Sequence, residues 1–255
     1  MNPPSHPASI AELIVHAMKN DRKVTEIRPE HVPADAASAY ALQREILRLR
    51  DATVGGWKVG SKSTSGGPIN GAPLPIEGLF AIGSQVKIGA YPQPILELEI
   101  AFRLNRDFAP RDEAYSDEEV LSSIGLMGTT IEIVSSRFAA WPKIEPLLAL
   151  GDLLNHGALI VGEFVPYDPD FPFLEPALTF TYAGEDIVPG DGANPAGDPR
   201  RLLPWVVNHH TQNGQSVTPD LVITTGSYTG MYQTKGPGLA SGEIRGLPPI
   251  SFKLI

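Results

Sequence analysis

A period of two in hydrophobicity marks the middle of the chain, over residues 94–104. Leucine, isoleucine and phenylalanine occupy the even positions from 96 to 104, while the odd positions carry Glu97, Glu99 and Arg103. This alternation predicts a β-strand with one face in a core. Glu97 and Glu99 project from the same face of such a strand, where two like charges are unfavourable without a compensating cation. The pair is typical either of an ordinary solvated face or of an oxygen-ligand platform for a divalent metal.

A third acidic residue stands in a similar setting. Residues 129–134 are rich in threonine, isoleucine and valine, and Glu132 is the only charged residue in the run 122–136. A lone carboxylate in such a strand is either badly desolvated or bound to something. Together with Glu97 and Glu99, it indicates a three-carboxylate metal site.

Capping signals and helical periodicity predict the helices. Ser9 and Glu12 form a capping-box pattern that opens a short helix to about residue 18. Asp35 caps a second helix whose apolar residues recur at helical spacing. Further helices are predicted over 117–124, 145–155 and 198–210. Pro204 is expected to kink or restart the last of these.

The remainder of the pattern favours strands. They are predicted near 53–60, 85–89, 94–104, 128–136, 157–165, 176–183, 221–228 and 248–254. Glycines at 236, 238, 242 and 246 indicate bends between late strands. Residues 61–78 are rich in Ser, Gly and Pro with almost no periodicity, which is typical of a loop that serves either as a lid or as a linker.

These elements predict an α+β protein with a small helical N-terminal part and a larger β-rich part. The predicted division is an N-terminal α/β lobe at 1–60, a loop or lid at 61–82, and a β-rich catalytic domain at 83–255.

Composition narrows the functions that the chain can have. At 255 residues and 42% hydrophobic content, the chain can bury a sizeable core. A net charge of −9 argues against nucleic acid and anionic membrane surfaces as partners. The absence of cysteine excludes disulfides, thiolate metal sites and a thiol nucleophile. The first seven residues lack the features of a signal peptide, and no apolar run reaches the length of a membrane span, so we expect a soluble, cytoplasmic protein.

Three further features could carry chemistry. Lys58 lies in a glycine-bounded apolar strand, which favours either an amine whose pKa burial lowers or an ammonium group that reaches solvent. Residues 224–231 form a hydroxyl-rich turn that suits a carboxylate or oxyanion, or is simply structural. His156 follows the helix expected at 145–155. It is either an active-site candidate or an ordinary helix-end histidine, stabilised there as an imidazolium by the helix dipole.

An ordered series of segments resembles the fumarylacetoacetate hydrolase superfamily, and within it the 2-keto-4-pentenoate hydratase and 4-oxalocrotonate decarboxylase branch. The segments, in chain order, are 39–43, 56–60, 97–102, 131–137, 157–162 and 225–230. They span most of the chain. The resemblance implies a mixed β-roll and a homo-oligomer.

The resemblance also implies a chemistry. Mg²⁺ or Mn²⁺ would be held by Glu97, Glu99 and Glu132 and would chelate a 2-keto acid, with Lys58 near the substrate and Thr225 on its carboxylate. The implied function is a metal-dependent lyase, foremost a hydratase of aromatic catabolism. Because the same enolate serves decarboxylation and C–C hydrolysis, both reactions stay open as alternatives.

The substrate side departs from the hydratases of this branch. Asn155 stands where they carry a serine, and it is predicted together with His156 at the substrate. Pro73 stands where they carry an acid, for which Glu77 is a candidate substitute. These departures motivate a further alternative, a catalytically silent relative or partner subunit that binds a keto acid without turnover. In the last alternative the acidic residues are simply solvated and the protein is structural.

Overall fold

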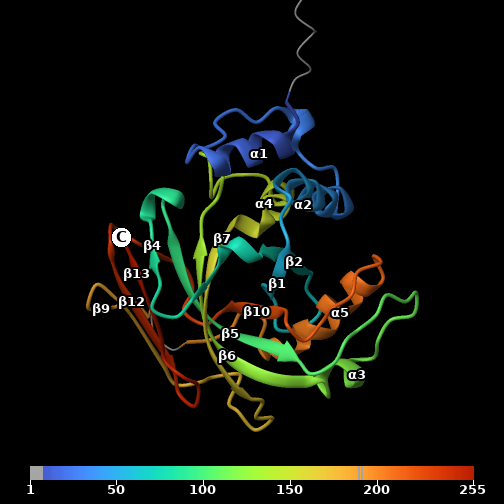
Figure 1. Ribbon diagram of the computed structural model, residues 1–255, viewed down its shortest axis with the longest axis vertical. Coiled ribbons are helices and arrows are strands. Elements are labelled where there is room, and N and C mark those ends of the chain that lie inside the picture. The colour runs from blue at the N-terminus through green and yellow to red at the C-terminus, as the bar shows by residue number, and fades with distance from the viewer. Residues whose placement is uncertain (1–7, 189, 191) are drawn as a thin grey trace, which may run out of the picture.

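The computed structural model describes residues 8–188, 190 and 192–255. The heptapeptide that underlies the targeting expectation lies outside this range. Within it, the chain forms two β-sheets, with helices at one end and along one side (Figure 1). The main sheet mixes parallel and antiparallel pairs. The predicted α+β class, with a helical N-terminal part and a larger mixed β-roll, is confirmed.

The α-helices are short, and the strands make up most of the regular structure. The helices are α1 (Ile10–Lys19), α2 (Ala36–Arg50), α3 (Asp117–Leu121), α4 (Pro146–Gly151) and α5 (Leu203–Thr211). The strands are β1 (Val54–Ser61), β2 (Ile69–Pro75), β3 (Leu79–Ala81), β4 (Gln85–Val86), β5 (Ile95–Leu104), β6 (Ile124–Val134), β7 (His156–Pro166), β8 (Leu178–Tyr182), β9 (Glu185–Asp186), β10 (Val222–Ser227), β11 (Tyr232–Gln233), β12 (Gly238–Ile244) and β13 (Ile250–Leu254). In the part of the chain that the structure describes, every helix falls short of the length and apolarity needed to cross a bilayer.

Helices α1, α2 and α4 gather at one end of the molecule around their own apolar cluster (Figure 1). The predicted capping box opens α1, because the Ser9 backbone N–H donates to the Glu12 carboxylate at 2.7 Å and Glu12 N–H donates back to the Ser9 hydroxyl. Asp35 caps α2 by accepting from Ser38 N–H at 2.7 Å. Local capping therefore fixes both helix starts where the sequence predicts them.

The main sheet carries the strands that matter for function. Among the described residues, its path runs β2-β1-β10-β5-β6-β7-β3, with β11 beside β5. The second sheet runs β4-β13-β12-β8-β9, and the largest apolar cluster includes buried residues from strands of both sheets. Strand β1 sits between β2 and β10. The domain boundary predicted at residue 60 lies within this strand, and the division into domains stays a prediction.

The loop predicted at 61–78, extended to 82 in the domain division, is wrong over β2 and β3. Residues 69–75 pair with β1, and 79–81 pair with β7. Strand β2 is the edge of the main sheet, where a proline breaks no ladder bond on its outer side, so Pro73 and Pro75 are tolerated there. Proline content therefore concealed an edge strand.

The bends predicted around Gly238 and Gly242 are also wrong, because both residues lie within β12. A Cβ atom at Gly242 would lie 2.5 Å from the side chain of Leu98, and one at Gly238 would lie 2.7 Å from the ring of Tyr182. These glycines make room for large side chains within the sheet and do not mark turns.

Two predicted helices are interrupted. The helix expected over 145–155 ends at Gly151, and 153–155 form a separate turn of 3-10 helix with left-handed backbone. The helix expected over 198–210 splits into a 3-10 turn (Pro199–Leu202) and α5, with Pro204 in the first turn of α5. Proline thus restarts the helix, as its sequence position predicts.

Candidate metal and substrate site

Five adjacent strands of the main sheet bring polar side chains to one place. In sheet order β1, β10, β5, β6 and β7, they contribute Lys58, Thr224, the pair Glu97 and Glu99, Glu132, and His156. The sequence separation between these residues is large, so the sheet and not the local chain assembles the site.

The acidic residues face each other across two strands. Glu97 and Glu132 are direct partners in the antiparallel pairing of β5 with β6. One carboxylate oxygen from each of Glu97, Glu99 and Glu132 lies within 4.8 Å of the others. Like charges directly opposite each other on a sheet are destabilising. The arrangement therefore calls for a cation.

Glu99 is held in place by the turn that ends β10. Its Oε2 accepts from the Thr224 hydroxyl and from the backbone N–H of Gly226 at 3.1 Å. Gly226 has a φ of +92° at a shift in the register between β10 and β5, a conformation that favours glycine. The hydroxyl-rich turn thus binds a carboxylate, as its composition suggests, but the carboxylate belongs to the protein.

Glu132 is oriented by two donors on the same oxygen. Lys58 Nζ lies 2.6 Å from Glu132 Oε1, and His156 Nδ1 lies 2.9 Å from the same atom. The other oxygen, Oε2, is buried and has no hydrogen-bond partner among the described residues. A fully buried carboxylate oxygen without a partner is costly, so this atom is poised for a ligand.

The pKa values of the acidic residues record this crowding. Burial, followed by the charges of Glu132 and Glu99, raises the pKa of Glu97 to about 8. Burial and the Glu132 charge raise the pKa of Glu99 to about 7. Burial alone would also raise the pKa of Glu132, but Lys58 and His156 outweigh it, so that this pKa is lowered. Glu132 is thus the carboxylate held ionised by the protein itself.

Lys58 differs from the expectation of a lowered pKa. Burial is the largest single effect and would lower its pKa, but the charges of Glu132, Glu97 and Glu99 together outweigh burial and raise it. Its side chain is only 14% exposed. Lys58 is therefore held as an ammonium in this arrangement, because the acidic residues surround it.

His156 lies at the start of β7 and not at a helix end. The left-handed turn at 153–155 separates it from α4. Burial, the largest effect, lowers its pKa despite the opposing pull of Glu132. The expectation of a dipole-stabilised imidazolium is therefore wrong. A neutral ring that donates from Nδ1 to Glu132 leaves Nε2 as an acceptor.

A cavity of about 640 Å³ opens beside the acidic residues. The polar residues on its wall are Lys58, Ser61, Lys62, Asn70, Glu97, Glu99, Asn194 and Ser227. This volume suits a small molecule. A ligand in the cavity can contact Lys58, Glu97 and Glu99. Glu132 does not line the cavity and is fully buried.

The structure does not bring Thr225 to this cavity. Its hydroxyl is fully buried and donates to the carbonyl of Ile100 at 2.7 Å. Among the described residues that line the cavity, Gly226 and Ser227 are present and Thr225 is not. Thr224, its neighbour in β10, is the threonine that contacts an acidic residue of the site, and the motif alone could not distinguish the two.

Asn155 lies close to the site but not on its wall. Its Oδ1 atom is buried and has no hydrogen-bond partner among the described residues. The preceding carbonyl, that of Leu154, accepts from Lys58 Nζ at 3.2 Å. The substrate roles predicted for Asn155, His156 and Thr225 stay predictions.

The turn at 153–155 is strained, because all three residues have φ between 50° and 58°. Left-handed backbone costs about 1 kcal/mol or more for each residue that is not glycine. A buried ion pair, Arg137 with Asp152, anchors the turn on both sides. Arg137 also donates to the carbonyls of Ser135 and His156, so that the pair ties the end of β6 to the start of β7.

Pro73 and Glu77 lie away from the acidic residues. Pro73 is in the edge strand β2, opposite Trp57. Glu77 pairs with Arg50 at 2.6 Å and lines a different cavity. Glu77 is therefore not among the described residues that line the cavity beside Glu97 and Glu99.

The donor set fits a hard divalent cation. Three carboxylates converge from two strands, Glu132 Oε2 is buried without a partner, and Glu97 borders a cavity that could admit exchangeable ligands. Oxygen donors with open positions suit Mg²⁺ and Mn²⁺. The sequence has no cysteine, and among the described residues His156 is the only histidine that contacts these carboxylates, so the donor set does not favour a softer metal.

Comparison with known proteins places the chain among related enzymes. No protein-family model matches it. The chain is 26% identical to the 2-keto-4-pentenoate hydratase of Burkholderia vietnamiensis over 249 residues, which cover 94% of each protein. Its fold matches 4-oxalocrotonate decarboxylase from Pseudomonas putida G7, complexed with magnesium and adipate, with a TM-score of 0.82, 20% identity and 96% coverage of both chains. A protein assigned to the fumarylacetoacetate hydrolase family from Yersinia pestis CO92 matches with a TM-score of 0.56 and 16% identity, covering 80% of this chain and 94% of that one.

The fold is therefore that of the fumarylacetoacetate hydrolase superfamily, and the chain is an enzyme of the hydratase, decarboxylase or hydrolase type. Its resemblance to the 2-keto-4-pentenoate hydratase and 4-oxalocrotonate decarboxylase branch is confirmed.

Proposed function

We propose that the protein is a divalent-metal-dependent lyase that acts on a 2-keto or 2-hydroxydienoic acid, as a 2-keto-4-pentenoate hydratase-like enzyme of aromatic catabolism. One observation carries this proposal: three carboxylates converge beside a cavity, and one of their buried oxygens has no partner. The hydratase relatives and the magnesium in the decarboxylase structure support it. The homo-oligomeric state implied by the resemblance and the cytoplasmic location expected from the sequence stay predictions.

Glu97, Glu99 and Glu132 would hold Mg²⁺ or Mn²⁺. A divalent cation supplies Lewis-acid polarisation of a keto acid's carbonyl and so favours its enol form. The protein's part is to fix the carboxylates. Thr224 and Gly226 orient Glu99, while Lys58 and His156 both bind Oε1 of Glu132 and leave Oε2 free. Such supporting hydrogen bonds tune metal affinity and ligand geometry.

Lys58 is the proposed catalytic residue. Its ammonium group lies on the cavity wall and is fixed between Glu132 Oε1 and the Leu154 carbonyl. From this position it can offer positive charge and a proton to a dienolate carbon during hydration. The same carboxylates that raise the pKa of Lys58 are those a metal ion would neutralise, so metal binding would make this proton easier to release.

Decarboxylation or acylpyruvate-type C–C hydrolysis is the second candidate. The fold likeness to the decarboxylase favours it, although this is an analogy of fold and not of site chemistry. All three reactions use the same enolate, so the metal platform cannot decide between them. The substrate that is consumed decides.

Turnover separates these possibilities. We would offer 2-hydroxypenta-2,4-dienoate, an oxalocrotonate and an acylpyruvate to the protein, each with Mg²⁺ and with EDTA. The proposal expects metal-dependent consumption of the dienoate in preference to the others. Lys58→Met should lower this rate by about 10²–10⁴-fold, whereas the exposed control Lys235→Met should not change it.

Consumption of the oxalocrotonate or the acylpyruvate instead would favour the second candidate. Binding of metal and ligand with no turnover of any substrate would instead identify a silent keto-acid-binding relative or partner subunit. Full activity of Lys58→Met would remove Lys58 from the catalytic role.

A further inference from the structure

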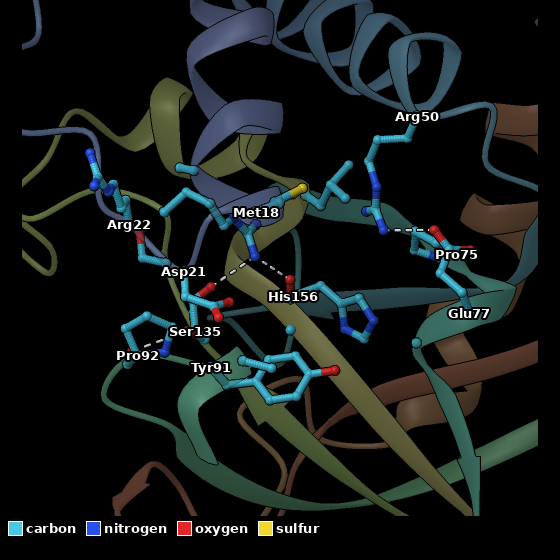
Figure 2. A pocket seen from close by; sticks show the side chains of 17 residues that line it. Met18, Asp21, Arg22, Arg50, Pro75, Glu77, Tyr91, Pro92, Ser135 and His156 are labelled. Atoms are coloured by element: carbon cyan, nitrogen blue, oxygen red, sulfur yellow. Dashed lines mark hydrogen bonds and ion pairs between the residues drawn. The ribbon is translucent and has the colours of Figure 1, made fainter. Parts of the chain in front are cut away.

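A second cavity, of about 180 Å³, lies on the other side of His156 from the acidic residues. It is enclosed by the end of α1, the end of α2, the turn after β2, and the junction of β6 with β7. Figure 2 shows Arg50, Glu77, Tyr91 and His156 around one end of it. Glu97, Glu99 and Lys58 are not among the described residues that line it. We call it the rear cavity.

His156 links the rear cavity to Glu132 through its two ring nitrogens. Nδ1 is engaged by Glu132 at 2.9 Å, whereas Nε2 has no hydrogen-bond partner among the described residues. The residue is only 3% exposed and lines the rear cavity. Because Nδ1 donates to Glu132, Nε2 is a bare acceptor. A buried acceptor without a partner is costly, so a ligand in the rear cavity that donates a hydrogen bond to Nε2 would be favoured.

The rear cavity also offers a cation. Arg50 uses one terminal nitrogen to pair with Glu77 at 2.6 Å, and its side chain is 22% exposed. A guanidinium has five N–H donors, so one ion pair leaves others for a second acceptor. Arg137 lines the same cavity but is already bound to Asp152 and to backbone carbonyls. Arg22 lines the cavity as well, but Figure 2 shows it at the end away from His156. Arg50 is therefore the cation that a ligand bound at His156 would meet.

We propose that the rear cavity is a second small-molecule site, which binds a short carboxylic acid with a hydrogen-bond donor on the carbon next to the carboxylate. The carboxylate pairs with Arg50, and the donor, a hydroxyl or an ammonium, bonds Nε2 of His156. Glu77 lies beside Arg50 as a further acceptor for the donor group. A plain carboxylic acid satisfies only Arg50 and leaves Nε2 unpaired.

Three isosteric acids test this chemistry. Propionate, lactate and alanine differ only at C2, which carries hydrogen, hydroxyl or ammonium. We would measure binding by saturation-transfer NMR to the full chain in EDTA, where the metal centre is empty and cannot chelate lactate. Lactate, alanine or both should bind at least fivefold more tightly than propionate. Propionate binding as tightly as both would overturn the proposal.

Gly78→Ala locates the site. A Cβ atom at Gly78 would lie 3.7 Å from His156 Nε2 and 3.5 Å from the Gly157 carbonyl, which is ordinary contact, so the fold can accept the methyl group while it crowds the donor position. The variant should weaken lactate or alanine binding at least fivefold. Gly89→Ala is the matched control, because a Cβ there meets no atom within 4 Å.

A final variant separates the two cavities. Glu97→Gln alters the acidic cavity and should leave lactate or alanine binding unchanged, whatever becomes of the proposed lyase activity. Binding that is lost in Glu97→Gln and kept in Gly78→Ala would place the ligand in the acidic cavity and contradict the proposal. Binding unaffected by Gly78→Ala would contradict it as well, provided that the melting temperature shows the variant to be folded.

Discussion

Two buried ionic clusters contact the strained turn at 153–155 or the residues that flank it, and they differ in how completely the protein satisfies their charges and hydrogen bonds. In the first, Asp152 binds Arg137 and Ser136 through its carboxylate, and Arg137 donates to three backbone carbonyls besides. In the second, three carboxylates face one ammonium, and both Glu132 Oε2 and His156 Nε2 lack partners among the described residues.

This difference in satisfied partners distinguishes a structural cluster from a candidate functional site. The Arg137–Asp152 cluster is closed, because each charge finds its partner within the chain. Burial still raises the pKa of Asp152 against the pull of Arg137, so the pair fixes geometry more than it adds stability. The acidic cluster is open, and its excess negative charge is unfavourable until a ligand arrives. An unfinished buried cluster beside a cavity is the better indicator of a site.

The largest effect should come from opening the closed cluster. Asp152→Asn leaves Arg137 buried without a counter-charge, and removal of one partner of a buried pair costs about 3–5 kcal/mol. For a chain of this size, that corresponds to a fall in melting temperature of about 10 °C. Thermal unfolding followed by circular dichroism measures this fall, with Asp112→Asn, a substitution at an exposed aspartate, as the control. Equal melting temperatures for the two variants would show that the closed cluster is dispensable.

In the open cluster, removal of a charge should raise the stability of the metal-free protein and not lower it. In metal-free protein, folding keeps a proton on Glu97 up to about pH 8, whereas an ordinary glutamate releases it near 4.5. The folded state therefore binds more protons, and stability falls as the pH rises through this window. The raised pKa of Glu97 can lower the free energy of unfolding by at most about 1.4 kcal/mol per pH unit within this window. Because Glu97 borders the cavity, solvent screens its charge, and we expect a total loss of about 2 kcal/mol.

Glu97→Gln should remove this loss, so that in EDTA at pH 8 the variant is more stable than the natural protein. Urea unfolding at pH 5 and pH 8 measures the difference. A variant that tracks the natural protein at both pH values, or is less stable at pH 8, would mean that the acidic residues do not repel one another as their spacing suggests.

Thr224 and Thr225 give the smallest effects and the finest comparison. Thr224→Val removes the hydroxyl that orients Glu99 and should weaken Mg²⁺ binding by about tenfold, in the range seen for groups that support metal ligands. Thr225→Val removes a hydrogen bond to Ile100 and should cost about 1 kcal/mol of stability, without a change in metal affinity or KM. Calorimetric titration and steady-state kinetics test the pair. A raised KM in Thr225→Val alone would restore Thr225 to the substrate role that the resemblance implies.

Local signals in the sequence were sufficient for much of the fold. Ser9 and Asp35 cap helices where predicted, because a cap depends on residues within one turn. Strand β2 was missed, because its prolines are acceptable only at a sheet edge, and edge position depends on the whole topology.

The site was predictable in part for a similar reason. Glu97 and Glu99 share a face by local geometry, and Glu132 stands out as a lone acid in an apolar strand. Which groups meet them depends on register between distant strands. The contact of Lys58 with Glu132 spans 74 residues, and that of Thr224 with Glu99 spans 125. Alternation along one strand cannot reveal such pairings.

The most direct test of the open cluster is a thermal-shift titration with Mg²⁺, with and without oxalate, which mimics the chelating end of an enolised 2-keto acid. A ligand at about a hundred times its dissociation constant stabilises a fold by about 2.7 kcal/mol. We predict that Mg²⁺ raises the melting temperature of the natural protein, that oxalate raises it further only when Mg²⁺ is present, and that Glu97→Gln abolishes both rises. No shift with either ligand would contradict the account and leave Glu97, Glu99 and Glu132 without a functional role.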